Sequence, residues 1–207
     1  PPVGPDEFIP LAESLGLIDR LGRRVFEQAC RQLHDWQKKT GNEAFFVSVN
    51  VSPRQLMDRN LADRLVALTR SMGVSPTCLK LEITENALEQ DFDTVRGVID
   101  DLVAAGFAIA LDDFGKGHSS LERVVSLPFS LLKVDRSFVW QTPDGRGAGV
   151  VKSLVDLARH LQLCALGEGV ETAAHETFLR DCGYIYAQGY LYGKPVAAGD
   201  FPLIASG

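Results

Sequence analysis

Two adjacent aspartates, Asp112 and Asp113, directly follow an apolar run in the middle of the chain. The run, residues 107–111, shows no polar alternation and so predicts a strand buried on both faces, as in a parallel sheet. Two carboxylates at the end of such a strand repel one another and lose hydration, and a divalent cation is the usual compensation. The pair therefore indicates a metal site, although a strand end followed by a helix N-cap explains two aspartates equally well.

Polar side chains follow the other predicted strands at the corresponding point. They are Asn50, Glu82, Asp112 with Asp113, Lys133 with Asp135, Glu168 and Gln188. In a barrel of alternating strands and helices, the carboxyl ends of the strands share one rim, and chemistry is carried out at that rim. Solvated strand ends would explain one acid, but they explain six aligned polar positions poorly. The sequence therefore predicts a shared site at this rim.

The elements that must position these side chains alternate along the chain. Strands are expected over residues 45–50, 79–85, 107–111, 131–135, 164–168 and 184–190. One long amphipathic helix is expected from residue 8 to residue 36, with a stripe formed by Leu17, Leu21, Val25, Ala29, Leu33 and Trp36. Further helices are expected over residues 56–72, 92–103, 150–161 and 173–182, with a short one ended by Pro128 and a loop over residues 140–149.

Composition limits the classes of protein. With 207 residues, 45% hydrophobic and 23% charged, the chain is most simply one domain, residues 1–207. The net charge of -6 argues against a nucleic-acid polymer or an anionic membrane as partner, but still allows a small anion held through metal ions. Four cysteines without a Cys-x-x-Cys pair favour a reduced cytosolic setting, and no apolar run reaches the ~20 residues of a membrane span.

Several motifs together resemble the EAL domain, a bacterial cyclic di-GMP phosphodiesterase. They are Phe8-Ile9-Pro10-Leu11-Ala12-Glu13, Asn50-Val51-Ser52 with Gln55-Leu56, Glu82-Ile83-Thr84-Glu85, Asp112-Asp113-Phe114-Gly115, Lys133-Val134-Asp135, Glu168-Gly169-Val170-Glu171-Thr172 and Gln188-Gly189-Tyr190. The similarity covers nearly the whole chain in order. It implies an α/β fold, a TIM-like (β/α) barrel with one reversed strand, and hydrolysis of cyclic di-GMP to linear pGpG with two Mg²⁺ or Mn²⁺ ions.

The resemblance also implies roles for individual residues. Asn50, Glu82 and Asp112 would hold one ion, and Asp112 would bridge to a second ion shared with Asp113 and Glu168. Lys133 would orient or help deprotonate the attacking water and, with Asp113 and Glu168, form the catalytic group. Glu85, Asp135 and Glu171 would anchor loops behind these ligands, and substrate contacts would come from Gln188, Gln55 and Pro10.

The family further implies a homodimer, attachment to sensor or GGDEF-type domains in a longer chain, and a cytoplasmic location, in some cases as part of a membrane-bound protein. This chain departs from the family pattern at Lys116 and His118, where Thr and Tyr are usual, in a loop that links the metal site to dimerisation. The Glu-Ala-Leu signature is not in this sequence and would lie upstream of Pro1. Because such a barrel has eight strands and six are predicted, we expect the given sequence to be part of a longer protein.

Two other functions fit some of the same residues. A catalytically inactive EAL-type receptor would bind cyclic di-GMP, but it would not need the aspartate pair, Lys133 and Glu168. An enolase-like enzyme would use Asn50, Glu82 and Asp112 with a lysine base, but the second aspartate and Glu168 favour two metal ions over one.

Overall fold

The structure is a computed structural model that describes residues 3–115 and 121–203. The chain forms two compact units. One comprises Pro1–Glu82, Gln90–Ala108 and Pro202–Gly207, and the other comprises Ile83–Glu89 and Ile109–Phe201. In the second unit, β3 (Ala108–Phe114), β4 (Leu131–Val134), β5 (Cys164–Gly167) and β6 (Tyr186–Ala187) are hydrogen-bonded in that order, which is also their order in the sequence. In the described residues, no helix has the length and apolar character that crossing a membrane requires.

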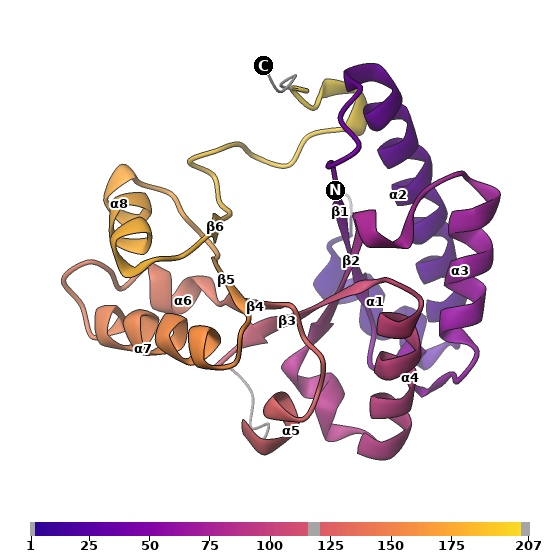
Figure 1. Cartoon of the computed structure of the whole chain (residues 1–207), viewed down its shortest axis with the longest axis horizontal. Helices are drawn as coiled ribbons and strands as arrows, with labels where there is room; N and C mark the ends of the chain where they lie inside the picture. The colour runs from indigo at the N-terminus through magenta and orange to yellow at the C-terminus, as the bar shows by residue number, and fades with distance from the viewer. Residues whose placement is uncertain (1–2, 116–120, 204–207) are drawn as a thin grey trace. The chain divides into compact units, whose positions relative to one another are not determined.

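The first unit packs helices against the beginning of the sheet. Helix α2 (Ile18–Thr40) contacts β1 (Val47–Val51) and α3 (Leu61–Ser71), and α3 contacts α4 (Phe92–Ala104) (Figure 1). The unit contains α1 (Pro5–Ser14), α2 (Ile18–Thr40), β1 (Val47–Val51), the 3-10 turns η1 (Gln55–Met57) and η2 (Pro76–Cys78), α3 (Leu61–Ser71), most of β2 (Leu79–Thr84) and α4 (Phe92–Ala104).

The single long helix expected from residue 8 to residue 36 is two helices, α1 and α2. The break lies at Gly16, whose φ of 68° is in the left-handed region that glycine adopts without steric cost. The amides of Gly16 and Leu17 donate to the carbonyls of Glu13 and Ala12, so the end of α1 is closed by the hydrogen bonds typical of a helix C-terminus.

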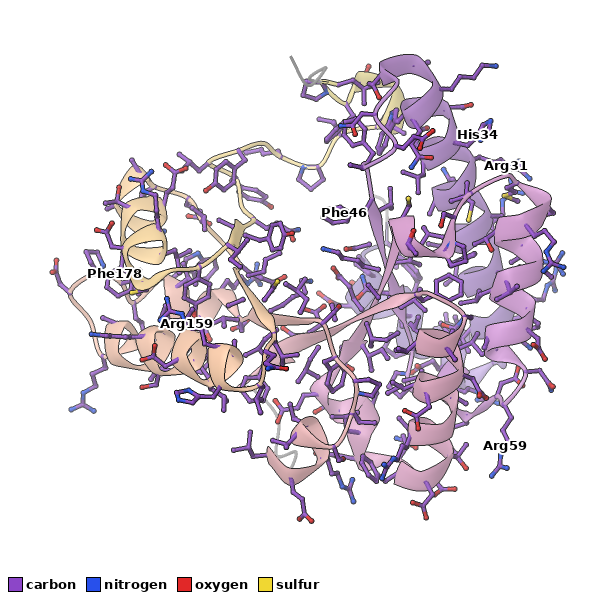
Figure 2. All side chains as sticks on the ribbon, in the orientation of Figure 1. Arg31, His34, Phe46, Arg59, Arg159 and Phe178 are labelled. Carbon is purple, nitrogen blue, oxygen red and sulfur yellow. The ribbon has the colours of Figure 1, made fainter. Side chains whose placement is uncertain are left out.

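The buried face of α2 also differs from the expected stripe. Within the expected stripe Leu33 is buried but Val25 is 45% exposed, whereas Phe26 and Cys30, which lie outside that stripe, are buried. Apolar residues occupy two neighbouring stripes of this helix at the same spacing, and periodicity alone does not determine which stripe faces the core. Arg31 and His34 lie on the exposed part of the same helix (Figure 2).

The second unit carries the remaining strands and their helices. Parallel pairing joins β3 to β4, β4 to β5 and β5 to β6. Helix α7 contacts α6, α8 and β5 (Figure 1). The elements are η3 (Glu85–Glu89), β3 (Ala108–Phe114), α5 (Leu121–Val125), β4 (Leu131–Val134), α6 (Arg136–Val139), α7 (Gly147–His160), β5 (Cys164–Gly167), α8 (Ala173–Cys182), β6 (Tyr186–Ala187) and η4 (Ala198–Asp200).

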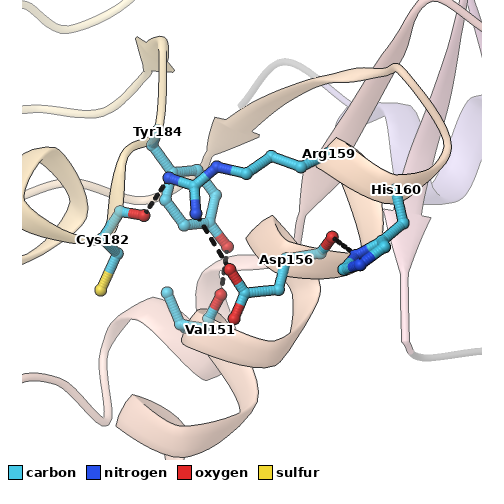
Figure 3. A network of polar contacts seen from close by, with 6 residues as sticks. All are labelled: Val151, Asp156, Arg159, His160, Cys182 and Tyr184. Atoms are coloured by element: carbon cyan, nitrogen blue, oxygen red, sulfur yellow. Dashed lines mark hydrogen bonds and ion pairs between the residues drawn. The ribbon is translucent and has the colours of Figure 1, made fainter.

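A polar network ties α7 to the end of α8. The buried Tyr184 hydroxyl donates to the Val151 carbonyl at 2.8 Å, and Arg159 Nη2 donates to the Cys182 carbonyl at 2.9 Å (Figure 3). Arg159 also pairs with Asp156 at 2.9 Å. A guanidinium at the last carbonyls of a helix satisfies acceptors that have no partner within the helix. Arg159 of α7 therefore caps α8, which carries Phe178 (Figure 2).

Candidate active site

The two aspartates lie in a bulge of β3. Leu111 pairs with Leu132 and Phe114 pairs with Val134, so Asp112 and Asp113 together lie opposite one residue of β4. A bulge of this kind changes the direction of side chains and often lies beside an active site. Asp113 has a φ of 55°, and its amide donates to Asp112 Oδ1 at 2.9 Å. The bulge therefore brings two consecutive carboxylates to the same end of the strand.

The residue of β4 opposite this bulge is Lys133. Its side chain is 4% exposed, and Nζ lies 2.9 Å from Asp112 Oδ1 and 2.8 Å from Glu168 Oε1. All four residues of β4 are buried, as expected for a central strand of a parallel sheet. A buried ammonium is tolerated when it is paired, and here two carboxylates from the two neighbouring strands supply the opposite charge.

Glu168 directly follows β5 and completes a group of three acids. Its amide donates to the Val134 carbonyl at 3.1 Å, which fixes its backbone beside β4. One carboxylate oxygen each from Asp112, Asp113 and Glu168 lie within 4.8 Å of one another, and all three side chains are half-buried. Three oxygen donors at this separation fit Mg²⁺ or Mn²⁺, which prefer carboxylates, better than zinc.

Glu85 and Asp135 accept hydrogen bonds from backbone amides next to the strands that carry the acidic cluster. Glu85, buried in η3, accepts a hydrogen bond from the Gly115 amide through Oε2 at 3.1 Å, and its role as a loop anchor stays a prediction. Gly115 has a φ of 99°, and an added Cβ would lie 2.8 Å from Phe138 Cε2. Asp135, 2% exposed, is the N-cap of α6 and accepts from the Ser137 amide at 2.9 Å. These contacts fix the segments that follow β3 and β4.

Comparison with known proteins identifies the family. Residues 2–195 match the EAL domain family. The chain belongs to the EAL domain family. It is 38% identical over 197 residues to a bifunctional diguanylate cyclase/cyclic di-GMP phosphodiesterase, MucR, of Pseudomonas aeruginosa, covering 95% of this chain and 29% of that protein. It is 36% identical over 195 residues to the cyclic di-GMP phosphodiesterase NbdA of the same organism, covering 94% of this chain and 25% of that protein.

A solved structure supports the same conclusion. The MucR phosphodiesterase in complex with cyclic di-GMP superposes with a TM-score of 0.89 at 37% identity, over 95% of this chain and 80% of that one. This confirms the predicted fold class, an α/β fold of the EAL type with a TIM-like barrel. The chain spans less than a third of the length of the two curated relatives.

Two further predicted residues of this EAL domain, Glu171 and Gln188, lie in the segments that follow β5 and β6 of the second unit. Gln188 is exposed, and its backbone pairs with Gly167 at 2.9 Å and with Val170 at 3.0 Å. Glu171 is exposed, and its amide lies 3.4 Å from His175 Nδ1. The backbone contacts of Gln188 and Glu171 fix the chain after β5, whereas the substrate contact proposed for Gln188 and the loop-anchoring role proposed for Glu171 stay predictions.

The remaining predicted residues belong to the first unit, which is described by itself. Asn50 is exposed in β1, Glu82 is buried in β2, and Pro10 lies on the exposed side of α1. Gln55 is buried and accepts from the Ser52 amide through Oε1 at 3.1 Å. Their roles as metal ligands and substrate contacts stay predictions. The departures at Lys116 and His118 lie outside the described residues.

Sequence reasoning missed one element of the EAL site, the short helix α6. Residues 136–139 carry no apolar repeat long enough to predict a helix, and the sequence predicts a loop over the residues that follow. The signal that could have revealed the helix is the N-cap pattern, an aspartate at position 135 two residues before Ser137. Helix α6 matters because Phe138 and Trp140 contact the segments that follow β3 and β5.

Proposed function

We propose that this EAL domain hydrolyses cyclic di-GMP to linear pGpG in bacterial second-messenger signalling. The observation that carries the proposal is the cluster of Asp112, Asp113 and Glu168 with Lys133 at the ends of three adjacent parallel strands. Two relatives are named as cyclic di-GMP phosphodiesterases, and one solved relative is a complex with this nucleotide. A receptor that only binds the nucleotide would have no need for a cluster of this composition.

Asp112, Asp113 and Glu168 are the residues of the second unit that would hold two Mg²⁺ or Mn²⁺ ions, with Asn50 and Glu82 as the proposed further ligands. When bound, such ions supply Lewis-acid chemistry: they polarise a phosphodiester and lower the pKa of bound water. The three carboxylates and one ammonium leave two net negative charges in the cluster. With the Glu82 carboxylate the proposed site would carry three net negative charges, and two divalent ions would convert these to one net positive charge, which favours binding of the doubly anionic cyclic di-GMP.

Lys133 has two functions in this proposal. Its ammonium holds the carboxylates of Asp112 and Glu168 in place through contacts at 2.9 and 2.8 Å. The same group is a hydrogen-bond donor beside the carboxylates that would hold the ions. There it can orient the attacking water and stabilise negative charge that develops in the transition state.

Partners of the domain follow from the family. The proposed ligand is cyclic di-GMP, and the domain is expected to form a homodimer. We also propose that it is joined to sensor or GGDEF-type domains, since the chain matches only 29% and 25% of the length of its two curated relatives. The proposed setting is the cytoplasm, where cyclic di-GMP would be encountered.

The proposal is tested by incubating the protein with cyclic di-GMP in Mg²⁺ or Mn²⁺ and identifying products by chromatography and mass spectrometry. We expect linear pGpG, no product after treatment with EDTA, and recovery when the metal is added back. Glu168→Gln removes one carboxylate charge at nearly constant volume and should abolish turnover. Binding of cyclic di-GMP with no product in either metal would favour the receptor function instead.

A further inference from the structure

The segment Glu168-Gly169-Val170 is held from two sides by its backbone. The Glu168 amide donates to the Val134 carbonyl at 3.1 Å, and the Val170 amide donates to the Gln188 carbonyl at 3.0 Å. Between these bonds the chain turns at Gly169, whose φ is 70°. The carboxylate that pairs with Lys133 therefore starts from a turn whose shape depends on the residues packed around Gly169.

Trp140 contacts this turn directly. Its indole Nε1 donates to the Gly169 carbonyl at 3.0 Å, and a Cβ added at Gly169 would lie 3.1 Å from the same nitrogen and would overlap Arg136. Trp140 is the residue after α6, and the Arg136 guanidinium lies 5.0 Å from the centre of its ring. The turn and α6 thus fit closely, and the indole supplies a hydrogen-bond donor to the turn.

The same short helix is tied to the strand that carries Lys133. Asp135 follows β4 and caps α6 through its bond to the Ser137 amide at 2.9 Å. The contacts therefore form a closed path from Lys133 through α6 and Trp140 to Gly169, and back from Glu168 to Lys133 through their ion pair at 2.8 Å. Loss of any link in this path should loosen the position of the Glu168 carboxylate relative to β4.

Hydrophobic burial does not fully account for Trp140. Its side chain is 47% exposed, so a large part of the apolar surface of the ring stays in water. The polar edge of the ring, in contrast, is directed at one peptide carbonyl beside the candidate active site. This arrangement is expected of a side chain whose hydrogen bond orients a loop.

We propose that Trp140 is a positioning residue, whose indole N–H holds the Gly169 carbonyl and thereby keeps the Glu168 carboxylate beside Lys133, Asp112 and Asp113. The inference rests on the proposed function, in which Glu168 is a metal ligand. It assigns no contact between Trp140 and the nucleotide. Trp140→Phe separates the two contributions of the side chain, because it keeps an aromatic ring and removes only the donor.

The first measurement is amide hydrogen exchange in the metal-free protein. Trp140→Phe should raise the exchange rates of the Glu168 and Val170 amides about threefold to tenfold, the effect of losing one hydrogen bond on local opening. Trp36→Phe is the matched control, because Trp36 is the other tryptophan of the chain and lies in the first unit. The control should leave both amides unchanged.

The second measurement is the Mn²⁺ affinity together with kcat and KM for cyclic di-GMP. Trp140→Phe should weaken Mn²⁺ binding about tenfold and lower kcat more than it raises KM, as expected when the support of a metal ligand is lost. Unchanged exchange at Glu168 and Val170 would overturn the inference. Faster exchange with unchanged Mn²⁺ affinity and kcat would also overturn it, because the loop would then be held without positioning the carboxylate.

The two proposals fail in different ways. If the wild-type protein neither binds Mn²⁺ nor hydrolyses cyclic di-GMP, the proposed function is wrong, and the metal-free exchange rates alone decide whether Trp140 holds the turn. If the wild-type protein is active and Trp140→Phe behaves like the wild type in both measurements, the proposed function stands and the positioning role is refuted.

Discussion

Replacing Lys133 by methionine tests the electrostatics of the cluster most severely. At an effective dielectric constant of about 20, each contact of Nζ with Asp112 and Glu168 is worth roughly 6 kcal/mol of gross attraction, most of which is offset by desolvation. Removing one partner of a buried pair costs about 3 to 5 kcal/mol. The side chains of Asp112 and Glu168 remain 14% and 19% exposed, so water screens part of this cost. We therefore expect Lys133→Met to lower the free energy of unfolding by about 2 to 4 kcal/mol.

For a chain of this size, such a loss corresponds to a fall in Tm of about 4 to 16 °C. The assay is thermal unfolding followed by circular dichroism, first in EDTA and then in Mn²⁺. We expect Mn²⁺ to narrow the gap between Lys133→Met and the wild type, because the cation replaces the missing positive charge. Lys152→Met, an exposed lysine of α7, is the matched control. The reasoning is refuted if Lys133→Met melts within about 2 °C of the wild type in EDTA, or if Mn²⁺ leaves the gap unchanged.

Three further predictions test the surrounding structure. Glu85→Ala should lower kcat for cyclic di-GMP hydrolysis about 10- to 100-fold, because the Gly115 amide loses its acceptor. Glu85→Gln keeps an oxygen acceptor and should retain most of this activity, and equal losses in the two variants would contradict the prediction. Gly183→Ala should cost about 2 to 3 kcal/mol in urea unfolding, because φ is 91° and the added Cβ would overlap the Arg159 guanidinium; Gly97→Ala, with open space around it, should instead stabilise α4 slightly. Burial raises the pKa of the Cys30 thiol to about 11, so this thiol loses its proton at a lower pH in the unfolded chain than in the folded one. The free energy of unfolding should therefore fall as pH rises from about 9 to 11. Cys30→Ala should reduce that decline between pH 8 and 10.5 by at most about 2 kcal/mol, and identical declines in both proteins would show that another group is responsible.

The sequence was sufficient to predict where the carboxylates lie along the strands. A buried strand followed by two acids has a distinct pattern, and the parallel order of β3, β4 and β5 brings Asp112, Lys133 and Glu168 together, as the polar strand ends predicted. The bulge at Asp113 could not be predicted, because it depends on the register with β4, which the sequence of β3 alone does not specify.

Local details of the helices were less predictable. The sequence does not predict the break at Gly16, because apolar residues continue on both sides of it at helical spacing and a glycine within such a pattern is often tolerated. The last strand is only Tyr186–Ala187, although residues 184–190 are rich in aromatic and β-branched side chains. Such residues favour a strand, but the hydrogen-bonding partners decide how much of the segment pairs.

The most direct test of the central claim is the rate of cyclic di-GMP hydrolysis by Asp113→Asn in Mn²⁺, relative to the wild type. Asparagine has nearly the same volume and tolerates the left-handed φ of 55°, so the bulge should persist while one ligand charge is lost. We predict a fall in kcat of about 100-fold or more, with an unchanged circular dichroism spectrum. Turnover close to that of the wild type would contradict the assignment of Asp112, Asp113 and Glu168 as the group that holds the catalytic ions.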